Sequence, residues 1–143
     1  MVRILFVCHG NICRSPMAEF ILKDLAAKAG ALDRFEIASA AVSREEIGNA
    51  VYPPARRELA KHGIDCAGKT ARQITEADLK YYDRIYYMDN SNWNRLIWQF
   101  GSKAQKCRKL LGRDVADPWY TDNFRQTWDD LLEGCQRILE EFL

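Results

Sequence analysis

The sequence predicts an α/β fold built on a parallel sheet, and two observations support this. Short apolar segments with strand character alternate with longer segments of helical periodicity along the 143 residues. No linker, internal repeat or low-complexity tract divides the chain, so we expect residues 1–143 to form a single domain. Folds of this class bind ligands beyond the carboxyl ends of their strands, so the loops at that edge are the first place to look for a site.

Four segments have the character of strands. Residues 3–7 are β-branched or apolar, which is typical of a strand that is buried on both faces. Residues 35–41 and 83–88 are predicted as the second and third strands, and residues 106–111 as a weaker fourth strand. These four segments are expected to make one sheet.

The helices between the strands are marked by their own start and stop signals. A helix begins near Ser15, with Pro16 expected at its first position and Gly30 just beyond its end. The other predicted helices are a short one from Pro53 to about Gly63, one capped by Thr75 and Asp78, an amphipathic one over 93–100, and a long one over 124–142 with an apolar stripe.

Composition excludes several classes of function. Twenty-one Lys and Arg balance 20 Asp and Glu, and a net charge of +1 offers no general attraction for nucleic acid or anionic membranes. No apolar run is long enough for a signal peptide or a membrane span, so we expect a cytoplasmic protein. Five cysteines without paired spacing, and only two histidines, indicate reduced thiols and predict neither a metal site nor a cofactor.

The loop after the first strand carries the residues with chemical potential. Cys8 ends that strand, and Arg14 follows six positions later beside Ser15, where a helix begins. A phosphate in this loop would meet backbone N–H groups, the positive end of the helix dipole and the planar fork of Arg14. The same groups favour a thiolate, which Ser15 can hydrogen-bond, so Cys8 is a candidate nucleophile. Gly10 permits close backbone approach, and Asn11 tolerates a left-handed conformation.

A cysteine followed by an arginine six positions later is a weak signal by itself. Three pairs in this chain match it, namely Cys8 with Arg14, Cys66 with Arg72, and Cys107 with Arg113. Only the first pair combines a preceding strand, Gly and Asn within the loop, and a following Ser-Pro that opens a helix. Cys66, Cys107 and Cys135, the last on the apolar stripe of the final helix, are expected to be structural.

This loop and its surroundings resemble a known family. Residues 7–19 read VCHGNICRSPMAE, and the segments SAA at 39–41, IGN at 47–49, RQI at 72–74 and DPWY at 117–120 follow in order. Together, over nearly the whole chain, these segments resemble the low-molecular-weight protein tyrosine phosphatases. The resemblance implies a four-stranded parallel sheet flanked by helices on both faces, and hydrolysis of phosphotyrosine in protein substrates through a phosphocysteine intermediate, without a metal.

The resemblance also assigns roles to single residues. Asp117 is expected to protonate the leaving group and then to activate water, although an Asp-Pro turn is the plain alternative. Asp89, with Ser91 and Asn92, matches a further segment of the family near the loop, but a role as helix cap explains this aspartate equally well. A reversible disulfide between Cys8 and Cys13 is a hypothesis from the resemblance. Contacts with phosphate or substrate are expected from His9, Gly10, Asn11, Ile12, Cys13, Ser15, Trp119 and Tyr120, the last two stacking on the substrate ring or anchoring their loop.

Three alternatives remain open from the sequence. A protein arginine phosphatase on the same scaffold typically has threonine before the second loop cysteine, where this chain has Ile12, so a phenyl ring is favoured. An arsenate reductase would need two further cysteines on a later segment, and residues 81–92 contain none. A phosphocarrier or a silent phosphate-binding module would not need Asp117. Glu45 stands where many members of the family carry an apolar or aromatic wall residue, and Lys69 stands where some have histidine, so pocket shape is less defined than chemistry.

Overall fold

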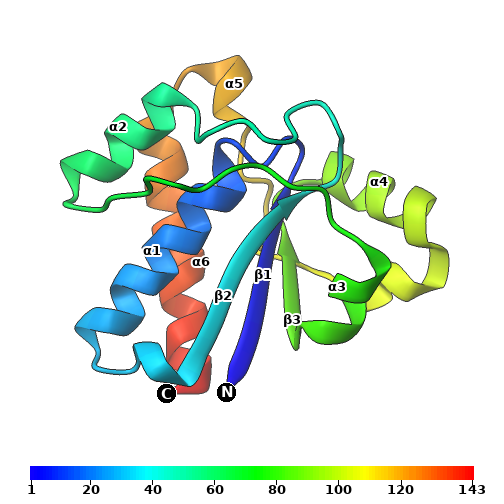
Figure 1. Ribbon diagram of the computed structural model, residues 1–143, viewed down its shortest axis with the longest axis horizontal. Helices are drawn as coiled ribbons and strands as arrows, with labels where there is room; N and C mark the ends of the chain where they lie inside the picture. The colour runs from blue at the N-terminus through cyan, green and yellow to red at the C-terminus, as the bar shows by residue number, and fades with distance from the viewer.

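The computed structural model describes residues 1–143 and contains one sheet of four parallel strands in the order β2-β1-β3-β4. The strands are β1 (Val2–Cys8), β2 (Phe35–Ala41), β3 (Arg84–Tyr87) and β4 (Arg108–Lys109). Strand β1 is central, pairing with β2 along its whole length and with β3 at residues 4–7 (Figure 1). The predicted fold class is confirmed.

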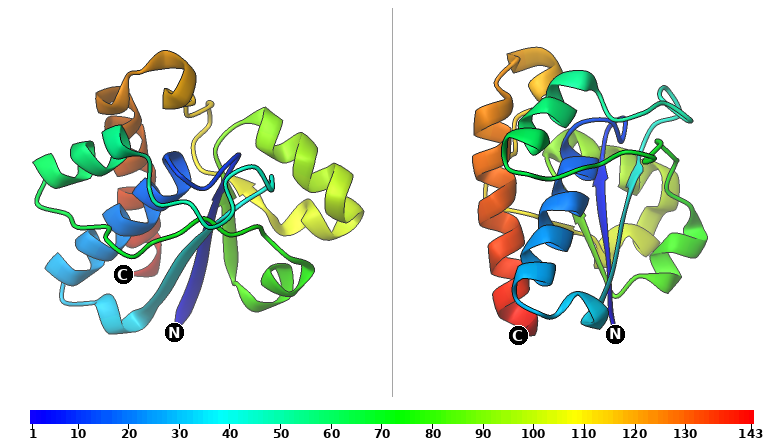
Figure 2. Two further views of the ribbon diagram at one scale, coloured as in Figure 1. Left: turned by 45° about the horizontal axis from the view of Figure 1, so that its top comes forward. Right: turned by 60° about the vertical axis from the view of Figure 1, so that its left-hand side comes forward.

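Helices cover both faces of this sheet (Figures 1 and 2). On one face lie α1 (Arg14–Lys28), α2 (Pro53–Lys61) and α6 (Phe124–Phe142), and on the other lie α3 (Glu76–Tyr81) and α4 (Asn90–Phe100). The 3₁₀ turns η1 (Leu32–Arg34) and η2 (Gly101–Lys106) and the short helix α5 (Pro118–Thr121) complete the fold.

The central strand explains why the two faces have separate cores. Ile4 and Phe6 pack into the apolar cluster that also contains α1 and α6 residues, whereas Leu5 and Val7 pack into the cluster beneath α3 and α4. All four side chains are fully buried, because successive side chains of a strand point to opposite faces and both faces here are covered. The continuous apolar run at residues 4–7 follows from this arrangement.

Several predicted boundaries hold, and others differ. Gly30, which follows α1, has a φ of 69°, and the capping box of Thr75 and Asp78 is present. Helix α1 begins at Arg14, so Pro16 occupies the third helical position instead of the first. Strand β4 is only two residues long, because residues 101–106 form η2 and the chain bends after Lys109. Residues 118–121 form α5, which the sequence analysis did not predict.

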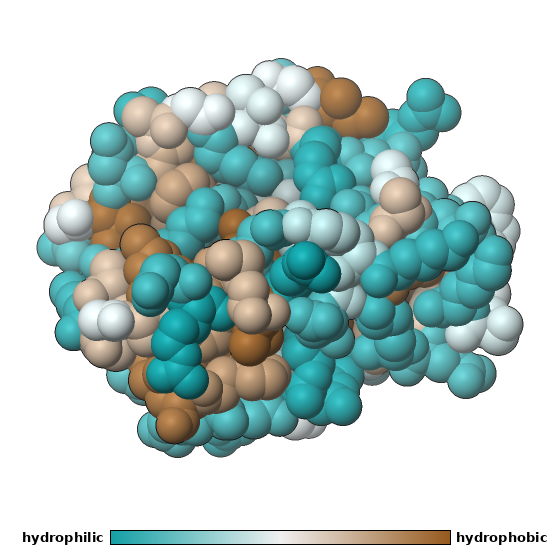
Figure 3. Space-filling model, turned by 60° about the horizontal axis from the view of Figure 1, so that its bottom comes forward, coloured by the Kyte–Doolittle hydropathy of each residue, from teal (hydrophilic) through white to brown (hydrophobic).

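The end of the molecule opposite the carboxyl ends of the strands holds both termini (Figure 1). Figure 3 turns this end forward and shows hydrophobic residues gathered at lower left among hydrophilic ones. Met1, Leu32 and Leu143 are among the exposed large hydrophobic residues. No helix combines the length and the apolar composition that crossing a bilayer requires.

Candidate active site

The loop between β1 and α1 lies at the carboxyl edge of the sheet and forms the floor of a cavity of about 130 Å³. Asn11 has a φ of 61°, which confirms the left-handed conformation predicted for this loop. The cavity is lined by Cys8, His9, Gly10, Ile12, Cys13, Arg14, Glu45, Glu46, Asp117, Trp119 and Tyr120.

Two groups of Ser15 form hydrogen bonds with the sulfur of Cys8. The Ser15 Oγ atom lies 3.1 Å from Cys8 Sγ, and the Ser15 backbone N–H donates to the same sulfur at 3.3 Å. Ser15 is the second residue of α1, so its N–H is one of the groups that a helix leaves without an internal partner. The predicted contact of Ser15 with the thiol is therefore present, while the N-cap position belongs to Cys13.

The other four cysteines have a different environment. Burial raises the pKa of the thiols of Cys13, Cys66 and Cys135 and raises the pKa of Cys107 to about 11. These thiols stay protonated at neutral pH, and all five cysteines are unpaired in the structure.

Arg14 is the most constrained charge in the site. Its side chain is 2% exposed, and Nη1 donates to Asp89 Oδ2 at 2.6 Å and to the Val115 carbonyl at 2.8 Å. Nη2 donates to Asp117 Oδ2 at 3.3 Å. Burial alone would lower the pKa of Arg14, but negative charge at Cys8, Asp117 and Asp89 outweighs burial and raises this pKa. Arg14 is therefore a permanent cation.

The hydrogen bonds of Arg14 leave a specific part of the guanidinium available. A guanidinium carries five N–H donors, and three of them are used by Asp89, Val115 and Asp117. The remaining two donors are the Nε–H and one N–H of Nη2. This pair matches two oxygens of a phosphate in bidentate fashion.

A buried hydrogen-bond network behind the loop holds Ser15 beside the thiol of Cys8. The Asn11 side-chain oxygen accepts from the Arg72 backbone N–H at 3.2 Å, so its NH₂ group faces Ser15 Oγ at 2.7 Å and Ser39 Oγ at 3.0 Å. Ser39 in turn donates to the Glu19 carboxylate at 2.6 Å. Ser15 Oγ accepts from Asn11 and donates to the Ala40 carbonyl at 3.4 Å, so the network holds this hydroxyl in place beside Cys8 Sγ.

Lys69 closes this network at its far end. Its Nζ donates to the Ser39 carbonyl at 3.0 Å and lies 3.5 Å from the Glu19 carboxylate. Burial lowers the pKa of Lys69, and the charge of Glu19 opposes this effect. Glu19, Ser39 and Lys69 thus act on the site only through the loop residues that they hold.

Asp117 and two aromatic residues form the wall opposite the loop. Asp117 has extended backbone geometry, as its position before a proline predicts, and caps α5 by accepting from the Trp119 N–H at 3.0 Å. Trp119 is 52% exposed and Tyr120 is 83% exposed, and the Trp119 ring packs on Tyr52 with centroids 4.8 Å apart. Trp119 therefore both anchors the segment and presents part of its ring at the mouth.

Two carboxylates also line the cavity, namely Glu45, which the resemblance put at a wall position, and Glu46, which was not expected there. Glu45 and Glu46 belong to the segment after β2, and Glu45 Oε2 lies 2.9 Å from His9 Nε2. The Glu46 Cγ atom lies close to Gly10, where a Cβ atom would meet it at 3.2 Å. The cavity mouth is therefore acidic, while its floor holds the buried cation of Arg14.

Most of the predicted contact residues lie together, with two exceptions. Asn11 and Ser15 are buried behind the loop and do not line the cavity. The Asp89 carboxylate has two roles, since it accepts a hydrogen bond from Arg14 and caps α4. Both explanations given for Asp89 from the sequence therefore hold, and it reaches Arg14 because it follows β3, the neighbour of β1, and parallel strands bring their carboxyl ends to one edge.

The two competing cysteine-arginine pairs form no comparable site. Cys66 is buried while Arg72 pairs with Asp78 at 2.9 Å, and Arg113, six residues after Cys107, pairs with Asp130 at 2.8 Å. No group of three or more His, Cys, Asp or Glu side chains is arranged to hold a metal ion.

Comparison with known proteins agrees with the geometry. Residues 3–142 match the family described as low molecular weight phosphotyrosine protein phosphatase. The chain is 40% identical to the low molecular weight protein-tyrosine-phosphatase YfkJ of Bacillus subtilis, over 97% of this chain and 94% of that protein. It is 37% identical to the pig low molecular weight phosphotyrosine protein phosphatase, over 96% of this chain and 94% of that one.

Solved structures give the same result. The crystal structure of YfkJ superposes with a TM-score of 0.94, covering 99% of this chain and 94% of that chain. The structure of a Drosophila arginine phosphatase, DARP, is also similar, with a TM-score of 0.85, 30% identity, and coverage of 97% and 96% of the two chains. The chain belongs to the low molecular weight phosphotyrosine protein phosphatase family.

Proposed function

We propose that the protein hydrolyses phosphotyrosine monoesters in protein substrates, with Cys8 as nucleophile, Arg14 as phosphate ligand and Asp117 as general acid and base. The main support for this proposal is that Arg14 donates hydrogen bonds to Asp89, Val115 and Asp117 and still has two N–H donors free for a phosphate. They belong to a buried cation that shares one cavity with Cys8 and Asp117.

In the first step the Cys8 thiolate attacks phosphorus. The bond between phosphorus and the tyrosine oxygen breaks, and Asp117 gives its proton to that oxygen, so a neutral phenol leaves. The charge on the phosphoryl oxygens is held by Arg14 and by the N–H groups of the loop, which are fixed before the substrate arrives. The product of this step is phosphocysteine.

In the second step the same groups act in reverse. The Asp117 carboxylate takes a proton from water, the water oxygen attacks phosphorus, and the bond between sulfur and phosphorus breaks. The thiolate that leaves is met by the hydroxyl and the backbone N–H of Ser15. Phosphate is released and Asp117 is protonated again.

The cavity wall favours an aromatic leaving group over a guanidinium. Ile12 gives an apolar side chain to the wall, and Trp119 and Tyr120 offer ring faces at the mouth. Phosphoarginine is the second candidate substrate, because the similar DARP structure is that of an arginine phosphatase and Glu45, Glu46 and Asp117 would suit a cationic guanidinium.

A phosphocarrier is the remaining alternative, and Asp117 speaks against it. A carrier must keep its phosphocysteine from water, whereas a carboxylate on the cavity wall promotes hydrolysis. Stable phosphoprotein after mixing with a phosphate donor would favour the carrier.

The test compares wild type with Cys8→Ser and Asp117→Asn on three substrates: p-nitrophenyl phosphate, a phosphotyrosine peptide and a phosphoarginine peptide. Cys8→Ser should be inactive on all three. Asp117→Asn should lose roughly 10²- to 10⁴-fold in kcat on the phosphotyrosine peptide and less on p-nitrophenyl phosphate, whose leaving group needs less protonation. Asp122→Asn is the matched control, because Asp122 directly follows α5 and lies outside the cavity lining.

Three results would contradict the proposal. Activity in Cys8→Ser would exclude the phosphocysteine. If Asp117→Asn lowered kcat equally on p-nitrophenyl phosphate and on the phosphotyrosine peptide, Asp117 would not be the general acid. A higher kcat/KM for the phosphoarginine peptide than for the phosphotyrosine peptide would show that phosphoarginine is the preferred substrate.

A further inference from the structure

A second groove lies beside the active-site cavity, between the segment after β2 and helix α4. It has a volume of about 360 Å³. Arg44 from that segment and Arg95 and Trp98 from α4 line it, together with the side-chain amides of Gln73 and Gln99. No carboxylate lines the groove.

The two arginines are free to meet a ligand. Arg44 and Arg95 are exposed, and neither takes part in any ion pair or side-chain hydrogen bond of the structure. The arginines at 14, 72, 84, 113, 125 and 137 each face a carboxylate. The groove thus presents two uncompensated positive charges, which attract carboxylate groups.

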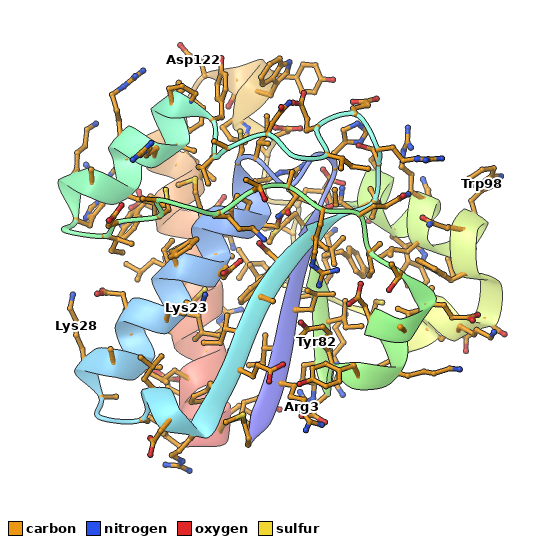
Figure 4. All side chains as sticks on the ribbon, in the orientation of Figure 1. Arg3, Lys23, Lys28, Tyr82, Trp98 and Asp122 are labelled. Carbon is orange, nitrogen blue, oxygen red and sulfur yellow. The ribbon has the colours of Figure 1, made fainter.

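Trp98 gives the groove an aromatic wall. Its side chain is 87% exposed, the highest value among the exposed large hydrophobic residues. It projects from the outer side of α4 (Figure 4). An exposed indole in the same groove as two arginines suits a peptide segment, since its face can pack on a chain and its N–H can donate a hydrogen bond.

The groove is joined to the active site by a short piece of backbone. The N–H of Val42 donates to the Cys8 carbonyl at 3.0 Å, and the N–H of Ser43 donates to the His9 carbonyl at 3.0 Å. The next residue, Arg44, lines the groove, and Glu45 after it lines the cavity. Adjacent Cα atoms are about 3.8 Å apart, so a peptide reaches from one site to the other within a few residues.

We infer that this groove binds acidic residues of the protein substrate while its phosphotyrosine occupies the cavity. The inference rests on the proposed phosphotyrosine activity and adds a sequence preference to it. Because Glu45 and Glu46 make the cavity mouth acidic, carboxylates directly beside phosphotyrosine are repelled. The favoured substrate therefore carries its acidic residues a few positions away, where they reach Arg44 and Arg95.

The test measures kcat/KM for three phosphotyrosine peptides. One has neutral flanks, and the other two carry a run of glutamates about three to six residues from phosphotyrosine, on the N-terminal or the C-terminal side. Wild type should prefer one acidic peptide over the neutral one by roughly three- to tenfold, as expected for two exposed charge pairs, and added salt should reduce this ratio. In the double variant Arg44→Ala, Arg95→Ala the ratio should fall close to one.

Arg57→Ala is the matched control. Arg57 is exposed on α2, lacks an ion pair, and lies outside both the groove and the cavity. Since each ratio is taken within one variant, differences in the active fraction of enzyme cancel. With activity on the neutral peptide intact, the inference is overturned if wild type lacks the acidic preference, if the double variant keeps it, or if Arg57→Ala reduces it equally. Absent activity on the neutral peptide would instead contradict the proposed function.

Discussion

The contact between Asp89 and Arg14 allows a sharp test of how the site is held. One carboxylate oxygen of Asp89 accepts from Arg14 Nη1 at 2.6 Å, and the other accepts from the Asn92 backbone N–H at 2.8 Å. In Asp89→Asn only one oxygen remains, and the amide NH₂ would face a donor at the other position. The asparagine oxygen can therefore accept a hydrogen bond either from Arg14 or from the Asn92 N–H that Asp89 caps, but not from both. Asp89→Ala serves neither.

The structure sets the expected magnitudes. Removing one partner of a buried ion pair costs about 3–5 kcal/mol. Asp89 is 17% exposed, and Arg14 keeps its bonds to Asp117 and Val115, so we expect about 2–3 kcal/mol for Asp89→Asn. Asp89→Ala should cost about 1 kcal/mol more, because alanine cannot cap α4.

Urea unfolding followed by circular dichroism measures these differences, and the kcat/KM for p-nitrophenyl phosphate reports the position of the Arg14 fork. We expect that rate constant to fall on the order of 10- to 100-fold in Asp89→Asn, since a small displacement of a phosphate ligand is costly. Asp129→Asn is the control. Asp129 pairs with Arg125 at 3.5 Å on the surface, and its loss should change stability by less than about 0.5 kcal/mol.

One outcome would refute this reasoning. If Asp89→Asn unfolded at the urea concentration of wild type and kept its kcat/KM, Asp89 would not hold Arg14, and the two free N–H donors would not be set by the hydrogen bonds described above.

Three further predictions concern the thiols, acid stability and packing. Iodoacetamide at neutral pH should modify Cys8 before the other four cysteines, because burial raises the pKa values of those four thiols. Inorganic phosphate should slow the modification of Cys8, and mass spectrometry of peptides identifies the modified residue. Burial alone would raise the pKa of Asp78, but hydrogen bonds from Arg72 and from Thr75 outweigh it and hold this pKa below its usual range. A carboxylate with a lowered folded pKa stabilises the protein above about pH 4 and loses that contribution as the pH falls further, so Asp78→Asn should flatten the acid limb of a stability curve measured by urea unfolding. In Gly134→Ala the new Cβ would lie 2.5 Å from Leu110 Cγ, so overpacking of about 1–3 kcal/mol should exceed the helix gain of about 1 kcal/mol and lower the melting temperature.

The parts of the fold that local chemistry specifies could be predicted from the sequence. The run at residues 4–7 indicates a strand buried on both faces, Asn11 indicates a left-handed residue, and Thr75 with Asp78 indicates a cap, because each signal acts within a few residues. Strand β4 was predicted too long, since its length depends on the turn η2, whose Lys106 donates to the carbonyls of Leu79 and Tyr82 from another part of the chain.

The same distinction between local and distant contacts applies to the residues of the candidate site. Cys8, Arg14 and Ser15 lie within one loop and its helix, so their spacing was readable. Glu45 was expected at the wall only from the resemblance, and Glu46 was not expected there, because both reach the cavity only when the segment after β2 hydrogen-bonds to the backbone of residues 8 and 9. No local pattern encodes such a contact between segments more than 30 positions apart.

The three cysteine-arginine pairs show what turns a short pattern into a candidate site. A phosphate ligand needs a cation that is buried, so that its field is strong, and that is held without using all of its donors. Arg72 and Arg113 fail the first condition, since their side chains are 39% and 54% exposed. Arg14 satisfies both, because β1 is the central strand and its carboxyl end lies beside that of β3, which carries Asp89. The useful signal is thus the pattern together with an acidic residue at the end of a neighbouring parallel strand.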